Sequence, residues 1–174
     1  MSLSLHAMAV ESFAPMLRSL SAILGKAAEQ AGARAPDLAS ARLAPDMYTL
    51  AQQVQLACRH AGDGVARLAG TVPPRADGDE TTLGALRERI AATVGYLESV
   101  DADAFEGAEE RDCSVPIPGD KVIAMTGVQF LRAWALPHFY FHVVTAYDIL
   151  RHHGIAVGKQ DYLSQVGAFV RPRA

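Results

Sequence analysis

The segment 136–150 is apolar on almost every side of a helix, and it constrains the fold more than any other feature. Its large apolar residues fall at successive positions and not along one stripe: Phe139, Tyr140, Phe141, Val143, Val144 and Tyr147. A helix without a polar face must be covered by other helices or by another subunit. We therefore expect this helix in the middle of a bundle or at a subunit interface. Pro137 predicts a kink or a fresh start near its beginning, and Gly154 its end.

Three earlier segments show the one-sided spacing of amphipathic helices, with apolar residues three or four positions apart. The first covers about residues 3–31. Pro15 lies inside it and predicts either a kink or a helix start near Ser12. Gly32 is expected to end it.

The second and third amphipathic segments carry clear start and stop residues. The second covers about residues 46–69, with Asp46 as the expected N-cap and Gly70 as the stop. A loop rich in proline, glycine and acidic residues follows. The third helix is expected to start at Thr81 or Thr82, and its apolar spacing is the clearest in the chain.

Between the third and the last helix the periodicity changes from helical to alternating. Residues 113–124 alternate apolar and polar around Pro118-Gly119-Asp120, which predicts a short β-hairpin. We therefore predict an all-α fold, a four-helix bundle with a small β-hairpin before the last helix. A chain of 174 residues fits one domain, 1–174. Long connections at 32–45 and 100–126 allow a topology other than simple up-and-down.

Composition excludes several classes of protein. The 16 basic and 19 acidic residues give a net charge of −3, which argues against a nucleic-acid-binding protein. Half of the residues are hydrophobic, too many for a disordered chain. Cys58 and Cys113 stand too far apart for a thiolate zinc motif. We expect a cytoplasmic protein with reduced thiols, without a signal peptide or a membrane span.

Histidines are the strongest candidates for chemistry. His138 and His142 lie four residues apart, so a helix places both rings on one face, within reach of a single metal ion. A third ligand must come from another helix, and His60 is the histidine in the middle of one. However, His60 lies about 100° from the apolar stripe of its helix, so it joins the pair only if that flank faces the last helix. The alternative is that His142 is a hydrogen-bonded core histidine.

Other polar residues near these histidines have two interpretations each. Asp148 either orients an imidazole or carries a surface charge that pairs with an arginine such as Arg151. Three glutamines of the second helix point in different directions, so at most two can line a polar cavity: Gln52, Gln53 and Gln55.

Two segments of the chain resemble signatures of a known family. The stretch LPHFYFHVVTAYDILRHHG, residues 136–154, followed by GKQDYL at 158–163, is similar to its C-terminal signature. PDMYTLAQQVQ, residues 45–55, with Cys58 to His60 is similar to its second-helix signature. The family is a bacterial one of unknown function within the DinB/YfiT-like metalloenzyme superfamily. The resemblance covers nearly the whole chain.

This resemblance implies a four-helix bundle that is often dimeric. In the wider superfamily, one histidine of the second helix and a His-x-x-x-His pair on the last helix bind a divalent metal, and these positions correspond here to His60, His138 and His142. Some members use the metal for transfers or isomerisations that depend on low-molecular-weight thiols. The particular family often has asparagine at the position of His138. Those members depart from the histidine triad, whereas this chain has all three histidines.

Two functional hypotheses follow. In the first, the protein is a bundle that binds Zn²⁺ or Ni²⁺ through His60, His138 and His142, and acts as a thiol-dependent transferase or a metal-assisted hydrolase on a small molecule. In the second, it is a non-catalytic dimeric bundle that binds a small ligand or a partner protein. We expect a homodimer, which both hypotheses allow; the two hypotheses differ in the metal.

Overall fold

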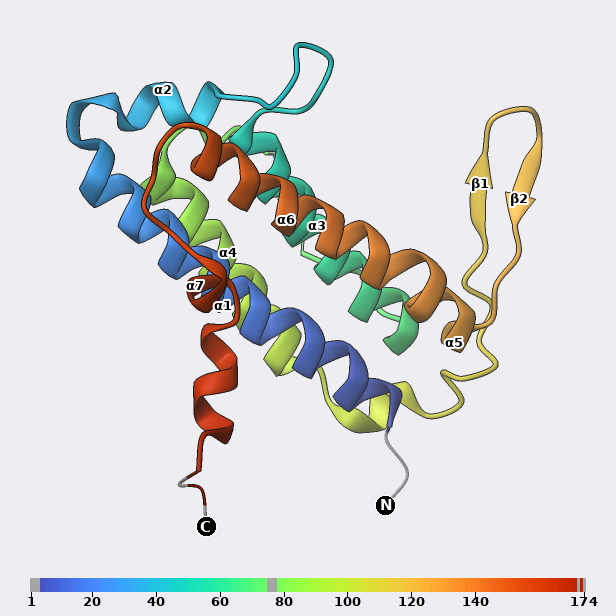
Figure 1. The fold of residues 1–174 in the computed structure, drawn as a ribbon. Helices are drawn as coiled ribbons and strands as arrows, with labels where there is room; N and C mark the ends of the chain where they lie inside the picture. Colours follow the sequence, from blue (N-terminus) through green and yellow to red (C-terminus); the bar gives the residue numbers. More distant parts are fainter. Residues whose placement is uncertain (1–3, 75–77, 172, 174) are drawn as a thin grey trace.

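A computed structural model of the protein describes residues 4–74, 78–171 and 173. Its four long helices form a bundle (Figure 1): α1 Leu5–Ala31, α3 Leu50–Ala69, α4 Leu83–Ser99 and α6 Leu136–His152. Helix α1 packs against α4, and α3 packs against both α4 and α6. The predicted class, an all-α bundle with a small hairpin, is confirmed.

Helix α1 starts earlier than Pro15 suggested. The Ser4 hydroxyl caps it by accepting a hydrogen bond from the Ala7 amide, and the helix then passes through Pro15 without interruption. A start near Ser12 is therefore wrong, because continuous burial of the apolar face outweighs the one hydrogen bond that proline removes. Gly32 ends the helix at φ 53°, as predicted.

The start of α3 also differs from the prediction. Thr49, and not Asp46, is the N-cap, since its hydroxyl accepts from the Gln52 amide while Gln52 Oε1 accepts from the Thr49 amide. This reciprocal capping box satisfies two otherwise free donors, which a lone aspartate does not. Gly70 ends α3 in the left-handed region at φ 68°, as predicted. No sequence pattern predicts α2, Ala35–Ser40, which lies within the expected loop 32–45.

The middle of the chain follows the predicted elements. Thr82 caps α4, and residues 75–77 of the preceding loop lie outside the described part of the chain. Strands β1, Val115–Ile117, and β2, Lys121–Ile123, pair antiparallel. The hairpin prediction is confirmed.

The last helix is reached through two short turns. Helix α5, Gly127–Phe130, leads into a π-helical turn, Leu131–Ala135, and then into α6. Pro137 lies in the first turn of α6, where an amide hydrogen is not needed for the helix, and the π turn directly precedes it. A side chain at Gly127 would meet the Ala108 carbonyl oxygen at 1.9 Å, so only glycine allows this approach.

Helix α6 is covered on one side by the bundle and exposed on the other. Phe139, Val143 and Ala146 are buried, whereas Phe141 and Val144 remain 57% and 40% exposed although both are apolar. The chain ends in α7, Lys159–Tyr162, and a 3₁₀ turn, Ser164–Phe169, that leave the bundle beside α1 (Figure 1).

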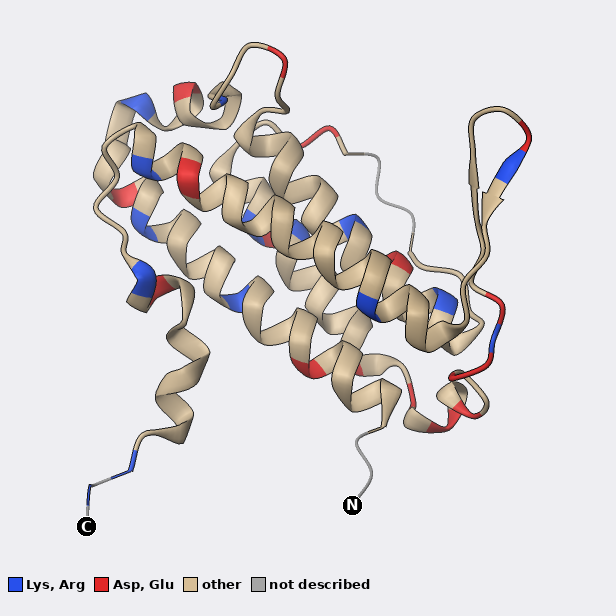
Figure 2. Cartoon of the chain, turned by 45° about the vertical axis from the view of Figure 1, so that its right-hand side comes forward, with Lys and Arg blue, Asp and Glu red and all other residues tan. Residues whose placement is uncertain are grey.

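Charge and hydropathy are distributed as expected for a helical bundle. Figure 2 shows basic and acidic residues interspersed on the long helices, while acidic residues gather in the segment between α4 and the hairpin. Among the described residues, the helical stretch Leu5–Ser40 contains an 18-residue window with a mean hydropathy of 1.2, long and apolar enough to cross a membrane. Half of that window is buried inside the bundle, as in the core helix of a folded domain.

Candidate functional site

The three predicted histidines meet between α3 and α6. The ring of His60 on α3 has its centroid 4.9 Å from that of His138 and 5.2 Å from that of His142, with ring planes inclined by 24° and 12°. The flank of α3 that carries His60 therefore does face α6. The packing of α3 against α6 decides this contact, because the helical spacing of His138 and His142 places only those two rings together.

A buried glutamine orients His142. Gln53 Oε1 lies 2.7 Å from Nδ1 of His142, and the two side chains are only 1% and 6% exposed. The Gln53 amide nitrogen donates to the Tyr48 carbonyl at 3.4 Å, so its oxygen is turned toward the imidazole. A carbonyl oxygen can only accept, so His142 Nδ1 carries the proton and Nε2 keeps a free lone pair.

A main-chain carbonyl orients His138 in the same way. His138 Nδ1 lies 2.8 Å from the carbonyl oxygen of Trp134, which belongs to the π turn before α6. The Trp134 ring also lies against the imidazole, with centroids 4.4 Å apart. Nε2 of His138 is therefore the nitrogen with a free lone pair, and the π turn supplies the acceptor.

The cluster favours neutral imidazoles. Burial, together with the neighbouring His142 and His138, lowers the pKa of His60 to about 4. Burial, together with His138, lowers the pKa of His142 to about 4. Both rings are therefore neutral at pH 7, which is the form in which histidine binds a metal ion.

A small cleft opens beside His60. It has a volume of about 220 Å³ and lies between α3 and the segment that leads into α6, with one wall from the hairpin residue Val115. Its polar lining consists of His60, Arg59, Asp63 and Arg67, and its aromatic lining of Phe130 and Trp134.

The donor set fits a metal ion chemically, although the rings are not gathered around one point. In the described part of the chain, no three His, Cys, Asp or Glu side chains stand close enough together to hold an ion. Imidazoles on one tetrahedral ion, at about 2.0–2.1 Å per bond, have ring centroids about 5 Å apart, close to the separations here. No hydrogen bond among the described residues holds the His60 ring in its present orientation.

The other sequence candidates lie elsewhere. Asp148 is exposed, so it does not orient an imidazole. Gln52 belongs to the cap of α3, and Gln55 donates to Glu80. Of the three glutamines, Gln53 alone reaches a histidine.

Sequence reasoning missed the residues of the cleft. Asp63 and Arg67 follow His60 by three and seven positions, and therefore lie on the same face of α3. Helical spacing from His60 could have identified them. No sequence pattern marks the Trp134 carbonyl, because its role depends on the π turn.

Comparisons with known proteins agree with this fold. A family model described as "Domain of unknown function (DUF1993)" matches residues 5–163. A solved structure described as a DinB family member protein from Shewanella denitrificans is 40% identical, with a TM-score of 0.84. The match covers 98% of this chain and 94% of that one. No curated protein matches the sequence.

Proposed function

The chain belongs to the DUF1993 family and has a DinB-like fold, and from this premise we propose that it binds a divalent metal ion, Zn²⁺ or Ni²⁺. The ligands we assign are His60, His138 and His142. The ion would serve a thiol-dependent transfer or a hydrolysis of a small molecule.

One observation carries this proposal: His138 and His142 each donate Nδ1–H to a carbonyl oxygen. Histidines that bind metals commonly donate the other ring nitrogen to a carbonyl or carboxylate, which fixes the tautomer and the direction of the free lone pair. A histidine that only fills the core is expected to have partners on both ring nitrogens, whereas among the described residues Nε2 of His138 and of His142 has no hydrogen-bond partner. Two such histidines one turn apart, with a third imidazole about 5 Å away, fit a ligand set better.

The chain's own residues would prepare this site in three ways. Gln53 and the Trp134 carbonyl hold two rings in the ligating tautomer. Burial of His142 keeps water away from it and keeps it neutral. Three imidazoles leave a fourth position open on a tetrahedral ion, where the bound metal supplies Lewis acidity to a water or a thiolate.

Metal analysis of untagged protein tests the proposal. After exposure to Zn²⁺ or Ni²⁺ and gel filtration, we expect about one equivalent in the wild type and a large loss in His142→Ala and His60→Ala. His153→Ala is the matched control, because His153 is an exposed histidine at the end of α6. Metal far below one equivalent, or equal metal in all variants, would refute the proposal and favour the non-catalytic alternative.

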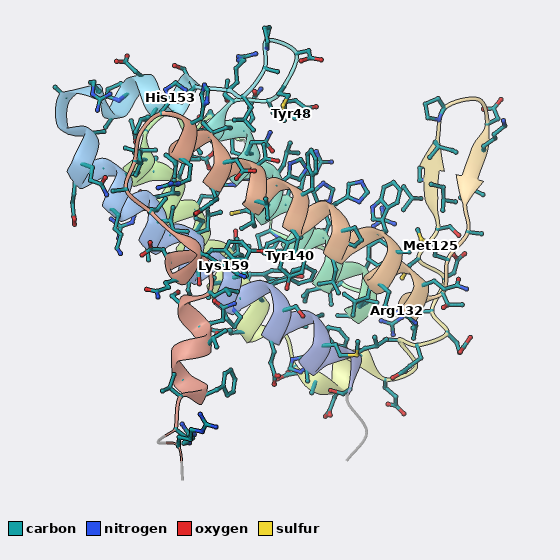
Figure 3. The ribbon with its side chains drawn as sticks, viewed as in Figure 1. Tyr48, Met125, Arg132, Tyr140, His153 and Lys159 are labelled. Atoms are coloured by element: carbon teal, nitrogen blue, oxygen red, sulfur yellow. The ribbon has the colours of Figure 1, made fainter. Side chains whose placement is uncertain are left out.

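We also propose that the protein is a cytoplasmic homodimer. Phe141 and Val144 are one turn apart on α6 and form an exposed apolar strip. Tyr48, on the loop before α3, is also largely exposed (Figure 3). Covering such residues against a second copy would remove apolar surface from water. This explains why α6 is apolar on both sides.

A further inference from the structure

The lining of the cleft beside His60 carries two arginines, Arg59 and Arg67, and one carboxylate, Asp63. Arg59 Nε lies 3.5 Å from Asp63 Oδ2, so these two charges offset each other. None of the ion pairs among the described residues involves Arg67, the second arginine in the lining. Arg67 therefore contributes a positive charge to the lining that no carboxylate of the described residues pairs with.

The guanidinium of Arg67 is held in place without being neutralised. Its Nη1 donates to the Ser114 carbonyl at 3.1 Å, and its central carbon lies 5.8 Å from the centre of the Phe130 ring. These contacts use one of its five N–H groups and leave the others for a ligand. A guanidinium fork matches the two oxygens of a carboxylate.

The size and the walls of the cleft restrict the rest of the ligand. A volume of about 220 Å³ is smaller than the ~300–1,000 Å³ pockets of drug-sized molecules and cofactors. The half-buried Trp134 ring offers a flat apolar surface, and Leu56 adds an aliphatic wall. These walls suit a flat or short apolar body.

We propose that this cleft binds a small organic acid, with its carboxylate on Arg67 and its apolar part against Trp134 and Leu56. This inference rests on the proposed function, because it names the class of substrate that the histidine cluster would act on. The binding itself requires no metal. It can therefore be tested separately.

Benzoate and benzamide form a suitable pair of probes, because they share a ring and differ in the carboxylate charge. Binding to metal-free protein would be measured by NMR titration. We expect benzamide to bind at least tenfold more weakly than benzoate, since a hydrogen bond to a charged group is commonly worth a factor of ten or more. Acetate, which lacks the ring, should also bind more weakly.

Two arginine variants locate the site. Arg67→Gln should weaken benzoate at least tenfold, whereas Arg132→Gln should change it less than twofold. Arg132 is exposed at the same end of the molecule and does not line the cleft (Figure 3). Arg67→Lys keeps the positive charge and should retain part of the affinity for benzoate. It is the conservative control, because a loss of binding in Arg67→Gln alone could also come from a folding defect.

The outcomes separate the two proposals. Equal binding of benzoate and benzamide, equal effects of both arginine changes to glutamine, or no benzoate binding would overturn the organic-acid site, even if the protein binds zinc. Benzoate binding that depends on Arg67 would support it, even if no metal binds and the proposed metal function fails.

Discussion

Replacing Gln53 by leucine tests whether the buried amide serves the histidine cluster. Leucine has a similar size but no acceptor, so it leaves the Nδ1–H of His142 buried without a partner. An unsatisfied buried donor costs about 1–3 kcal/mol, so the free energy of unfolding of metal-free Gln53→Leu should fall by that amount. Loss of the partner of a metal-binding histidine typically lowers metal affinity about 10–100-fold. We expect a loss of Zn²⁺ affinity in that range.

The assay has two parts and a conservative control. Urea unfolding followed by circular dichroism gives the stability, and competition with a chromophoric chelator at pH 7.5 gives the zinc affinity. Gln53→Glu retains an oxygen at the same position and should restore zinc affinity to within a few-fold of the wild type. If Gln53→Leu binds zinc as tightly as the wild type, then the contact with His142 has no role in metal binding.

Three further predictions concern titration, thiol reactivity and assembly. Because burial lowers the pKa of His60 and His142 to about 4, the unfolded state binds more protons below pH 6.5. The free energy of unfolding of the metal-free protein should thus fall by about 3 kcal/mol per histidine as the pH falls from 6.5 to 4. Urea titrations at several pH values measure this, and the free energy of unfolding of His142→Gln should fall less over the same range. Burial raises the pKa of the Cys58 thiol to about 11, so iodoacetamide should label it at pH 8 in urea but not in the native protein; rapid native labelling would contradict the burial. Phe141→Asp should convert the proposed dimer into a monomer in sedimentation at micromolar concentration, and an unchanged sedimentation coefficient would exclude this face as the interface.

Most helices of the fold could be predicted because their signals are local. Apolar spacing locates the four long helices, and Gly32, Gly70 and Thr82 mark ends that the structure confirms. The errors also have local causes. Residue type alone favours Asp46 as the N-cap, whereas the reciprocal bonds of Thr49 and Gln52 decide the start of α3.

The candidate site was only partly predictable because it depends on contacts between helices. The spacing of His138 and His142 places them on one face in any α-helix. No spacing within one helix says which way α3 turns, so the approach of His60 could be stated only as a condition. The same holds for Gln53, one of three neighbouring glutamines, which differs from the others only in the direction that α3 gives it.

The amino-acid sequence is sufficient to determine that this chain forms a bundle with a small hairpin and that its last helix carries two histidines on one face, since helical periodicity and end residues act within a few positions. Packing of α3 against α6 decides that His60 joins them, that Gln53 and the Trp134 carbonyl fix their tautomers, and that Arg67 lines a cleft beside them. These features link residues up to 89 positions apart, as in the bond between Gln53 and His142. The rotation and pairing of whole helices control such contacts, and burial of the entire core determines both.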